Sequence, residues 1–384
     1  MEAADGDAVC EFFAGMGLVR RAVEGATTWP ARNVVWANDF DPVKGRLYRA
    51  SFGPASEHVF DPRDIHDVQP DDVPRADLWT ASFPCTDLSL AGRGRGIHAG
   101  QSAAVWRLLE LLEAKKPGER PTHILFENVP ALLSSHGGAD FAALVQSVHG
   151  AGYGVDPMLV DAACFTSQSR LRVILLATKL GSSCEPARVD PSRLAPTLMR
   201  PARLLAAMRC SGDAVWHARD VKAPTISAKP ALVDILEDIC DDSPVWWDAA
   251  RTERFVQQAH PAHRDRLTAL RSGAHAGVAT AFRRMRVIEG VKRPVWELRV
   301  DGLAGCLRTP KGGSAVQALV DARSGAIRVR KLSPIECARL QGVETLPEGF
   351  SDTDLLFALG DAVCVPAIRW ALELLAPDAA AVAL

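Results

Sequence analysis

The sequence predicts a doubly wound, Rossmann-like α/β sheet joined to a smaller, irregular domain. In the first 180 residues, short apolar runs alternate with stretches of helical spacing, as strands and helices do in a mostly parallel sheet. Glycine-rich and polar motifs follow several of these runs, at the strand ends where such sheets bind ligands. After about residue 180 the alternation ends and prolines become frequent.

The elements of the sheet are expected in a regular order. The predicted strands are residues 9–13, 33–37, 77–81, 123–126 and 173–177. The predicted helices are a segment that ends near residue 24, residues 42–51 and residues 141–150. Apolar runs of this length, bounded by turn residues, are typical of buried strands.

The rest of the chain predicts a separate domain and a returning segment. Residues 251–271 have helical spacing, and residues 333–340 should form a helix capped by Ser333, with Pro334 first and Glu336 third. Residues 366–375 form an apolar helix able to pack back onto the first domain. We therefore expect domains at 1–181 and 182–318, followed by a C-terminal segment at 319–384.

Composition is that of an ordinary globular protein, with 48% hydrophobic and 23% charged residues among 384. No apolar run approaches the roughly 20 residues that span a membrane, and the acidic start does not resemble a secretory signal. Both observations predict a cytoplasmic protein. The net charge is only −2, but residues 251–330 carry 16 Lys/Arg against 6 Asp/Glu. Such a local excess favours contacts with phosphates.

Nine cysteines are scattered along the chain without the close spacing of a zinc site or a redox motif. We expect no metal site, and most of these thiols should be buried and reduced. Only their sequence context can single out one cysteine for catalysis. The nine positions are Cys10, Cys85, Cys164, Cys184, Cys210, Cys240, Cys306, Cys337 and Cys364.

The first two strand ends carry residues suited to a nucleotide-like cofactor. Phe13, Gly15 and Gly17 follow the first strand, and glycines there let the backbone approach a ligand at a helix N-terminus. Asp39 closes the second strand and is placed to accept hydrogen bonds from ribose hydroxyls. Asp64 is a candidate for an adenine amino group, with Phe13 or Phe40 stacking on the ring.

The stretch from Ser82 to Ser89 singles out Cys85. This cysteine follows a predicted strand and a turn-fixing proline, Pro84, and it precedes a loop rich in glycine. A structural cysteine is more often found within an apolar run than just past it. The loop also carries Arg93 and Arg95, the composition of a mobile lid that closes on nucleic acid.

Two further motifs carry charged groups at strand ends. Glu127 and Asn128 close the fourth strand, where burying a carboxylate is costly unless it is paired or functional. Arg170 and Arg172 alternate on one face of the next strand. Their guanidinium groups are suited to holding the glutamate, a pyrimidine oxygen or a phosphate.

Taken in order, these motifs resemble those of the DNA (cytosine-5)-methyltransferase family, over roughly residues 8–178 and 328–376. The pairing of Pro84-Cys85 with Glu127-Asn128-Val129 is the most specific part. The full set adds Phe13-x-Gly-x-Gly, Gln168-x-Arg170-x-Arg172, Ala338-Arg339-Leu340-Gln341-Gly342 and Gly360-Asp361-Ala362-Val363. Asp361 departs from the family, which usually has asparagine there.

The resemblance implies an S-adenosylmethionine-dependent methyltransferase sheet and a target-recognition domain. The implied catalytic residues are Cys85, Glu127, Arg170 and Arg172. The implied cofactor-binding residues are Phe13, Gly15, Gly17, Asp39, Phe40, Asp64, Ile65, Pro84, Asp361 and Val363. The implied DNA contacts are Ser89, Arg93, Arg95, Asn128, Arg308 and Lys311. The implied cofactor is S-adenosylmethionine, with S-adenosylhomocysteine as product and no metal.

The implied reaction is covalent. The Cys85 thiolate attacks carbon 6 of a flipped cytosine, Glu127 donates a proton to ring nitrogen 3, and carbon 5 takes the methyl group. Double-stranded DNA is the expected partner, with a cognate restriction endonuclease or defence proteins as further candidates. The protein is expected to act as a monomer at the nucleoid, in restriction-modification or related phage defence.

Two alternatives remain open from the sequence. One is the tRNA-modifying branch of the same family, although the large region between Arg172 and Arg330 favours DNA. The other is a catalytically inactive, methyltransferase-like DNA-binding module, against which the intact Cys85 and Glu127 argue. No Pro-Pro-Tyr motif occurs, which argues against methylation of an amino group.

Overall fold

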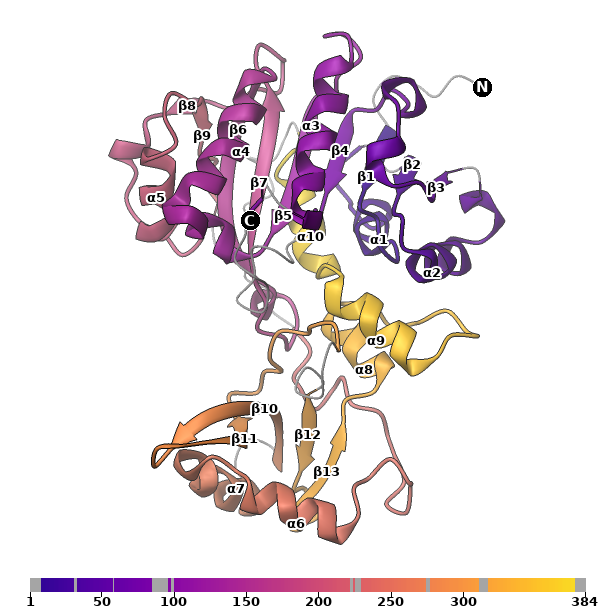
Figure 1. The fold of residues 1–384 in the computed structure, drawn as a ribbon, viewed down its shortest axis with the longest axis vertical. Helices are drawn as coiled ribbons and strands as arrows, with labels where there is room; N and C mark the ends of the chain where they lie inside the picture. Colours follow the sequence, from indigo (N-terminus) through magenta and orange to yellow (C-terminus); the bar gives the residue numbers. More distant parts are fainter. Residues whose placement is uncertain are drawn as a thin grey trace. The chain divides into compact units, whose positions relative to one another are not determined.

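The structure is a computed structural model that describes residues 8–30, 33–57, 59–84, 96–97, 100–221, 224, 229–273, 277–310 and 317–376. The chain divides into two compact units (Figure 1). The first unit comprises Met1–Asp161, Leu171–Thr225 and Val365–Leu384. The second unit comprises Ala162–Arg170 and Ile226–Cys364.

The first unit is built on a nine-stranded sheet in the order β3-β2-β1-β4-β5-β7-β6-β9-β8. Strands β3, β2, β1, β4 and β5 are parallel, and β7 runs antiparallel to both β5 and β6. The order reverses between β1 and β4, the switch point beside which doubly wound sheets bind ligands. This confirms the predicted fold class. The strands are β1 (Ala8–Phe12), β2 (Asn33–Asn38), β3 (Phe60–Asp61), β4 (Leu78–Ala81), β5 (His123–Asn128), β6 (Tyr153–Asp161), β7 (Leu171–Lys179), β8 (Arg188–Val189) and β9 (Trp216–His217).

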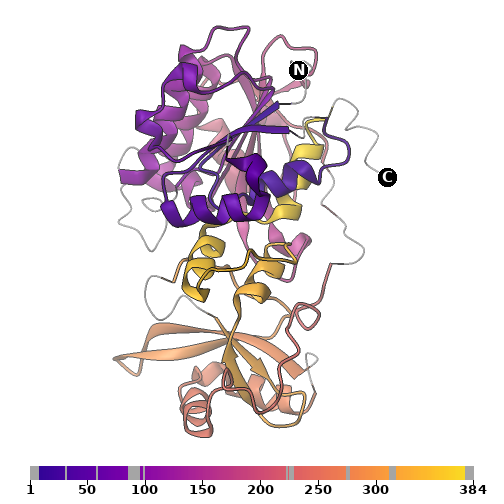
Figure 2. The ribbon, with the colours of Figure 1, turned by 90° about the vertical axis from the view of Figure 1, so that its right-hand side faces the viewer.

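Helices cover both faces of this sheet (Figure 2). One apolar cluster joins alternate residues of the strands, such as Cys10 and Phe12, to α3, α4 and α5. Helices α1 and α10 pack on each other, on the opposite face of the sheet. A helix thus lies where one was expected at residues 366–375, and it contacts α1. The helices of this unit are α1 (Leu18–Glu24), α2 (Pro42–Phe52), α3 (Ala104–Ala114), α4 (Ala139–Gly150), α5 (Ala202–Arg209) and α10 (Val365–Glu373).

The compact units have other boundaries than the predicted domains. Residues 182–225 pack with the first unit, because Leu204, Leu205 and Met208 of α5 and Trp216 of β9 join its core. Residues 319–364 pack with the second unit. The assignment of target recognition to residues 182–318 stays a prediction.

The second unit contains a four-stranded antiparallel sheet in the order β11-β10-β12-β13. Helices α6 and α7 cover one face through an apolar cluster that includes Phe255, Leu267 and Leu270. The sequence predicted an irregular domain here, so this sheet was not expected. Its elements, with α8 and α9, are β10 (Val278–Ile288), β11 (Val291–Arg299), β12 (Ala318–Asp321), β13 (Arg328–Lys331), α6 (Ala249–Gln257), α7 (Arg264–Arg271), α8 (Pro334–Leu340) and α9 (Asp352–Asp361).

Two helix predictions were tested in the second unit. The helical patch at 251–271 is two helices, because Pro261 lies in the short turn between α6 and α7. The capping of α8 is confirmed, since the side chains of Ser333 and Glu336 each bond the other's backbone amide. Glu336 also forms a buried, two-armed ion pair with Arg330.

One apolar stretch, Asp352–Glu373, is long and apolar enough by composition to cross a membrane. The sequence predicted no such run. The stretch forms two separate helices, α9 and α10. Of the 18 consecutive residues that meet the test of hydropathy, 56% are buried. Buried helices of globular proteins pass the same test of length and composition, so this is weak evidence for a membrane span.

Candidate active site

The turn between β1 and α1 has the backbone of a ligand-binding loop. Phe13, Gly15 and Gly17 all have positive φ, at 56°, 58° and 85°. A side chain at Gly17 would overlap the ring of Phe52, whereas nothing lies within 4 Å of a Cβ added at Gly15. Gly17 is therefore required by packing, and Gly15 leaves open space in front of the turn.

Asp39 closes β2 and holds this turn in place. Its carboxylate accepts hydrogen bonds from the backbone amides of Gly15 at 2.8 Å and Asp41 at 2.9 Å. The side chain is buried, and burial raises the pKa of its carboxyl above the ordinary value, partly opposed by Lys44 and these amides. The structure thus brings two of the predicted cofactor residues, Gly15 and Asp39, into direct contact.

The remaining cofactor candidates of the first unit lie at the ends of β2 and β3. The ring of Phe40 is 52% exposed, so it is available for stacking. Asp64 is exposed and caps the short helix Ile65–Asp67 through the amide of His66. Ile65 is buried in the core cluster. Asn38 was not predicted as a site residue. Its side-chain amide donates to the carbonyls of Asp61 and Arg63 and so anchors the loop between β3 and the short helix Ile65–Asp67.

Glu11 is a second residue that sequence analysis missed. Its carboxyl is buried in the middle of β1, near the amide of Arg20 at 3.3 Å and the hydroxyl of Tyr48 at 3.5 Å. Burial raises its pKa to about 8, against the lowering effect of Arg20 and Tyr48. A carboxyl in a predicted strand gives no sequence signal of its own, because strand residues can face either way.

The segment that leads to Cys85 is fixed from β5. Pro84 is described, while Cys85, Ser89, Arg93, Arg95 and Lys311 lie outside the described residues. The side-chain amide of Asn128 donates to the carbonyl of Phe83 at 3.1 Å, and its oxygen accepts from the amide of Val129 at 2.8 Å. Asn128 therefore ties β5 to the residues just before the predicted nucleophile.

Glu127 and Arg172 form a pair at the edge where β5 and β7 run side by side. Their side chains are only 10% and 15% exposed, and Arg172 Nε lies 2.9 Å from Glu127 Oε1. Glu127 Oε1 is buried and has no hydrogen-bond partner among the described residues, although this cation lies beside it. Arg172 also donates to the carbonyl of Leu171 at 2.8 Å. A carboxyl group thus held, with bonding capacity left, is suited to engaging a ligand.

Arg170, predicted as catalytic, is buried in the second unit. Its guanidinium donates to the carbonyls of Leu307 at 2.9 Å and Ala362 at 2.6 Å. Gln168 accepts from the Leu307 amide at 3.0 Å, and Gln341 donates to the Ala362 carbonyl at 3.1 Å. The two glutamine side chains also bond each other at 3.2 Å. Three motifs that are distant in sequence are therefore joined in one network.

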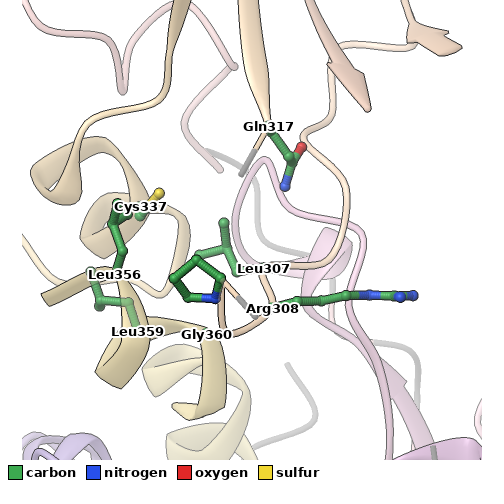
Figure 3. Close-up of a pocket in the computed structure, with 8 residues that line it drawn as sticks. Leu307, Arg308, Gln317, Cys337, Leu356, Leu359 and Gly360 are labelled. Carbon is green, nitrogen blue, oxygen red and sulfur yellow. The ribbon is translucent and has the colours of Figure 1, made fainter. Parts of the chain in front are cut away.

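The other candidates in the second unit lie beside this network. Asp361 is exposed at the end of α9, and Val363 is buried. Arg308 is exposed, and Figure 3 shows its side chain extending away from a small, mostly apolar pocket. A side chain at Gly360 would overlap the backbone of Arg308 and Thr309, so the chain needs glycine there. The pocket is lined by Leu307, Arg308, Pro310, Gln317, Cys337, Leu356, Leu359 and Gly360.

Cys337 in this pocket is no second nucleophile candidate. Its side chain is buried, and burial raises the pKa of the thiol far above the ordinary value. The described residues contain no cluster of three or more His, Cys, Asp or Glu side chains that could hold a metal ion.

Solved structures resemble this chain at low sequence identity. A Dnmt2 methyltransferase from S. pombe aligns with a TM-score of 0.60 at 16% identity, covering 96% of this chain and 97% of that one. The methyltransferase EhMeth from Entamoeba histolytica aligns with a TM-score of 0.60 at 14% identity, over 97% and 99%. At such identities the likeness shows the fold alone.

Sequence comparisons give closer relations. M2.BsuMI, a Type II methyltransferase of Bacillus subtilis (strain 168), is 42% identical over 116 residues, which are 30% of this chain and 29% of that protein. M.NgoBI of Neisseria gonorrhoeae is 26% identical over 228 residues (54% and 67%). The orphan methyltransferase M.SssI of Spiroplasma monobiae is 30% identical over 154 residues (39% of each). The aligned regions thus cover from 29% to 67% of the length of these relatives.

The family model is matched along almost the entire chain. The model described as C-5 cytosine-specific DNA methylase aligns with residues 8–375. This range includes the Gly15–Asp39 turn, the Glu127–Arg172 pair and the network around Arg170. The protein therefore belongs to the C-5 cytosine-specific DNA methylase family.

Proposed function

We propose that this protein transfers a methyl group from S-adenosylmethionine to carbon 5 of a flipped cytosine in a specific duplex DNA sequence. The observation that carries the proposal is the Glu127–Arg172 pair at the end of β5. Through Asn128, the same strand end is tied to the segment that leads to Cys85. A carboxylic acid at the end of β5 and, in the sequence, a cysteine shortly after β4 match the chemistry of the family.

The β1–α1 turn fits S-adenosylmethionine. Open space lies in front of Gly15, the buried Asp39 carboxylate stands behind the turn, and Phe40 offers an exposed ring. In this proposal Asp39 and Asp64 take the ribose and the adenine, and Phe40 stacks on the base. When bound, the cofactor supplies an electrophilic methyl group.

The residues of the chain prepare the cytosine for that group. The thiolate of Cys85 adds to carbon 6, and the ring electrons move toward nitrogen 3, where Glu127 donates a proton. Arg172 holds the glutamate in position. Carbon 5 is then nucleophilic and accepts the methyl group. Loss of the proton from carbon 5 to water and return of the nitrogen 3 proton to Glu127 restore the aromatic ring and expel the thiolate.

Such chemistry requires the base to leave the duplex, because its ring atoms are inaccessible inside the stack. The excess of cations at 251–330 supports a DNA-facing role for the variable region. Curated relatives include Type II and orphan methyltransferases. These names support a role in restriction-modification or related phage defence, and we propose that the enzyme acts as a monomer in the cytoplasm.

Tritium transfer from labelled S-adenosylmethionine to duplex DNA tests this proposal, with Cys85→Ser as the inactive control. The wild-type protein should also form a covalent adduct with duplex DNA that contains 5-fluorocytosine. Failure of both measurements would overturn the proposal. Preferential labelling of tRNA in a parallel reaction would favour the RNA branch instead. Bisulfite sequencing of DNA from expressing cells then gives the target sequence.

A further inference from the structure

The hairpin of β10 and β11 extends beyond the sheet that carries it. β10 pairs with β12 only from Val278 to Ala281, whereas it pairs with β11 as far as Ile288. Residues 282–288 and 291–297 therefore form a two-stranded ribbon. Its one further backbone pairing among the described residues is the bridge between Trp296 and Ala259 at its base. At about 3.3 Å per residue, the ribbon projects roughly 20 Å past the last residue paired with β12.

The two faces of the ribbon differ in how their charges are satisfied. Residues opposite one another in the register share a face, so Arg284, Arg286 and Arg293 lie on the same side. Arg284 and Arg286 both pair with Glu297, and Arg293 pairs with Glu289 of the turn. We call this the paired face.

The opposite side, which we call the open face, carries Arg283, Met285, Val287, Lys292 and Pro294. Arg283 and Lys292 are exposed, and neither makes an ion pair with a described residue. Met285 and Val287 are 51% and 69% exposed. Exposed apolar side chains next to uncompensated cations are typical of an interaction surface.

Near the base of the ribbon, the side of the hairpin that becomes the open face is packed against α6 and α7. Ala281 and Leu298 lie on the same side and pack into the cluster with α6 and α7. Trp296 is the last covered position, with its ring 5.3 Å from that of Phe255 and 5.7 Å from that of Trp247. Beyond it, Met285, Val287 and Lys292 are exposed.

We propose that this open face enters the major groove of duplex DNA. The groove is about 12 Å wide and admits a two-stranded ribbon. Arg283 and Lys292 suit guanine edges or phosphates, and Met285 and Val287 suit thymine methyl groups. Five cations against one carboxylate between Arg283 and Arg293 complement a polyanion. This inference rests on the proposed function and adds the surface that reads the duplex.

The ribbon itself supplies the matched control. Arg283→Gln/Lys292→Gln removes two charges from the open face, and Arg286→Gln/Arg293→Gln removes two from the paired face. Both changes lie on an exposed ribbon, where lost ion pairs cost little stability. Fluorescence anisotropy measures the affinity of each full-length variant for a 30-base-pair duplex in the presence of S-adenosylhomocysteine. The duplex contains the target sequence identified by bisulfite sequencing, in its unmethylated form.

The open-face variant should weaken binding at least about tenfold, and the paired-face variant less than about threefold. Met285→Ser/Val287→Ser should reduce the preference for the target over a scrambled duplex. Equal affinities for the two charge variants would overturn the inference, even with methylation intact in the wild type. The inference would also be overturned if the wild type is a dimer and Met285→Ser/Val287→Ser dissociates it without changing the affinity for DNA. The open face would then be an interface between two copies of the chain. A wild-type protein that methylates no duplex would instead contradict the proposed function itself.

Discussion

The side chain of Asn128, at the end of β5, donates to the carbonyl of Phe83, two residues past the end of β4, at 3.1 Å. Its oxygen is bonded to the amide of Val129. Both polar atoms are therefore engaged with main chain. We infer that Asn128 positions the segment before Cys85, while the DNA contact expected from the sequence stays a prediction.

Asn128→Ala should lower kcat by at least about tenfold, because small displacements of a nucleophile are costly. The affinity for S-adenosylmethionine should stay within about twofold, since the β1–α1 turn is not altered. Asn128→Asp keeps the acceptor but loses the donor, so it should resemble the alanine variant. Steady-state kinetics and equilibrium cofactor binding measure both. A fully active aspartate variant would contradict this role.

Arg172 has a different task, since it lies beside the buried carboxylate of Glu127. Arg172→Ala should leave that group without its cation, lowering both kcat and the free energy of unfolding, the latter by about 2 kcal/mol. Arg172→Lys should restore part of the stability but little of the rate, because an ammonium group cannot reproduce the planar guanidinium contacts. Urea unfolding and initial rates of methyl transfer separate the two effects. Equal rates for the lysine variant and the wild type would refute this.

The two glycines of the cofactor turn differ in what they tolerate. Gly15→Ala meets open space and should cost about 1 kcal/mol from its positive φ alone. Gly17→Ala adds overlap with Phe52 and should cost about 3 kcal/mol. Gly15→Ala should nevertheless weaken cofactor binding, because its methyl group fills the space proposed for the ligand. Calorimetry and chemical unfolding of both variants test this, and an unchanged cofactor affinity in Gly15→Ala would argue against the placement.

Glu11 should make stability depend on pH. Its pKa is raised from 4.5 to about 8 in the folded protein, so the unfolded chain releases this proton at lower pH than the folded one. The contribution of Glu11 to stability is therefore fully present below about pH 4.5 and is lost as pH rises through 8. Glu11→Gln should remove this part of the pH dependence and become relatively more stable toward pH 8. Urea unfolding from pH 5 to pH 8 measures it, and parallel curves for the two proteins would exclude the effect.

The first unit was largely predictable from sequence because its signals are local. Buried parallel strands appear as short apolar runs, and the end of such a run marks the edge of the sheet. Asp39 and Glu127 could be found in that way. In the second unit, the capping of α8 was predictable for the same reason, since Ser333 and Glu336 lie three residues apart.

The second unit was less predictable for physical reasons. Arginines occupy both faces of the distal half of β10, so the alternation that marks a half-buried strand is lost. Two of the partners of Arg170 are main-chain carbonyls, which leave no trace in residue type. Its position in the alternating pair with Arg172 predicted a shared role, but the structure places the two side chains in different environments.

The anchoring of the segment at Leu307 has a consequence for evolution. Gln168 and Arg170 hold this segment through its amide and its carbonyl, which every residue except proline can provide. The sequence there can diverge without loss of its attachment. Under the proposed function, a recognition surface carried on such an anchor can be replaced by recombination or drift, and new target specificities can arise without rebuilding the unit that holds Glu127 and Arg172.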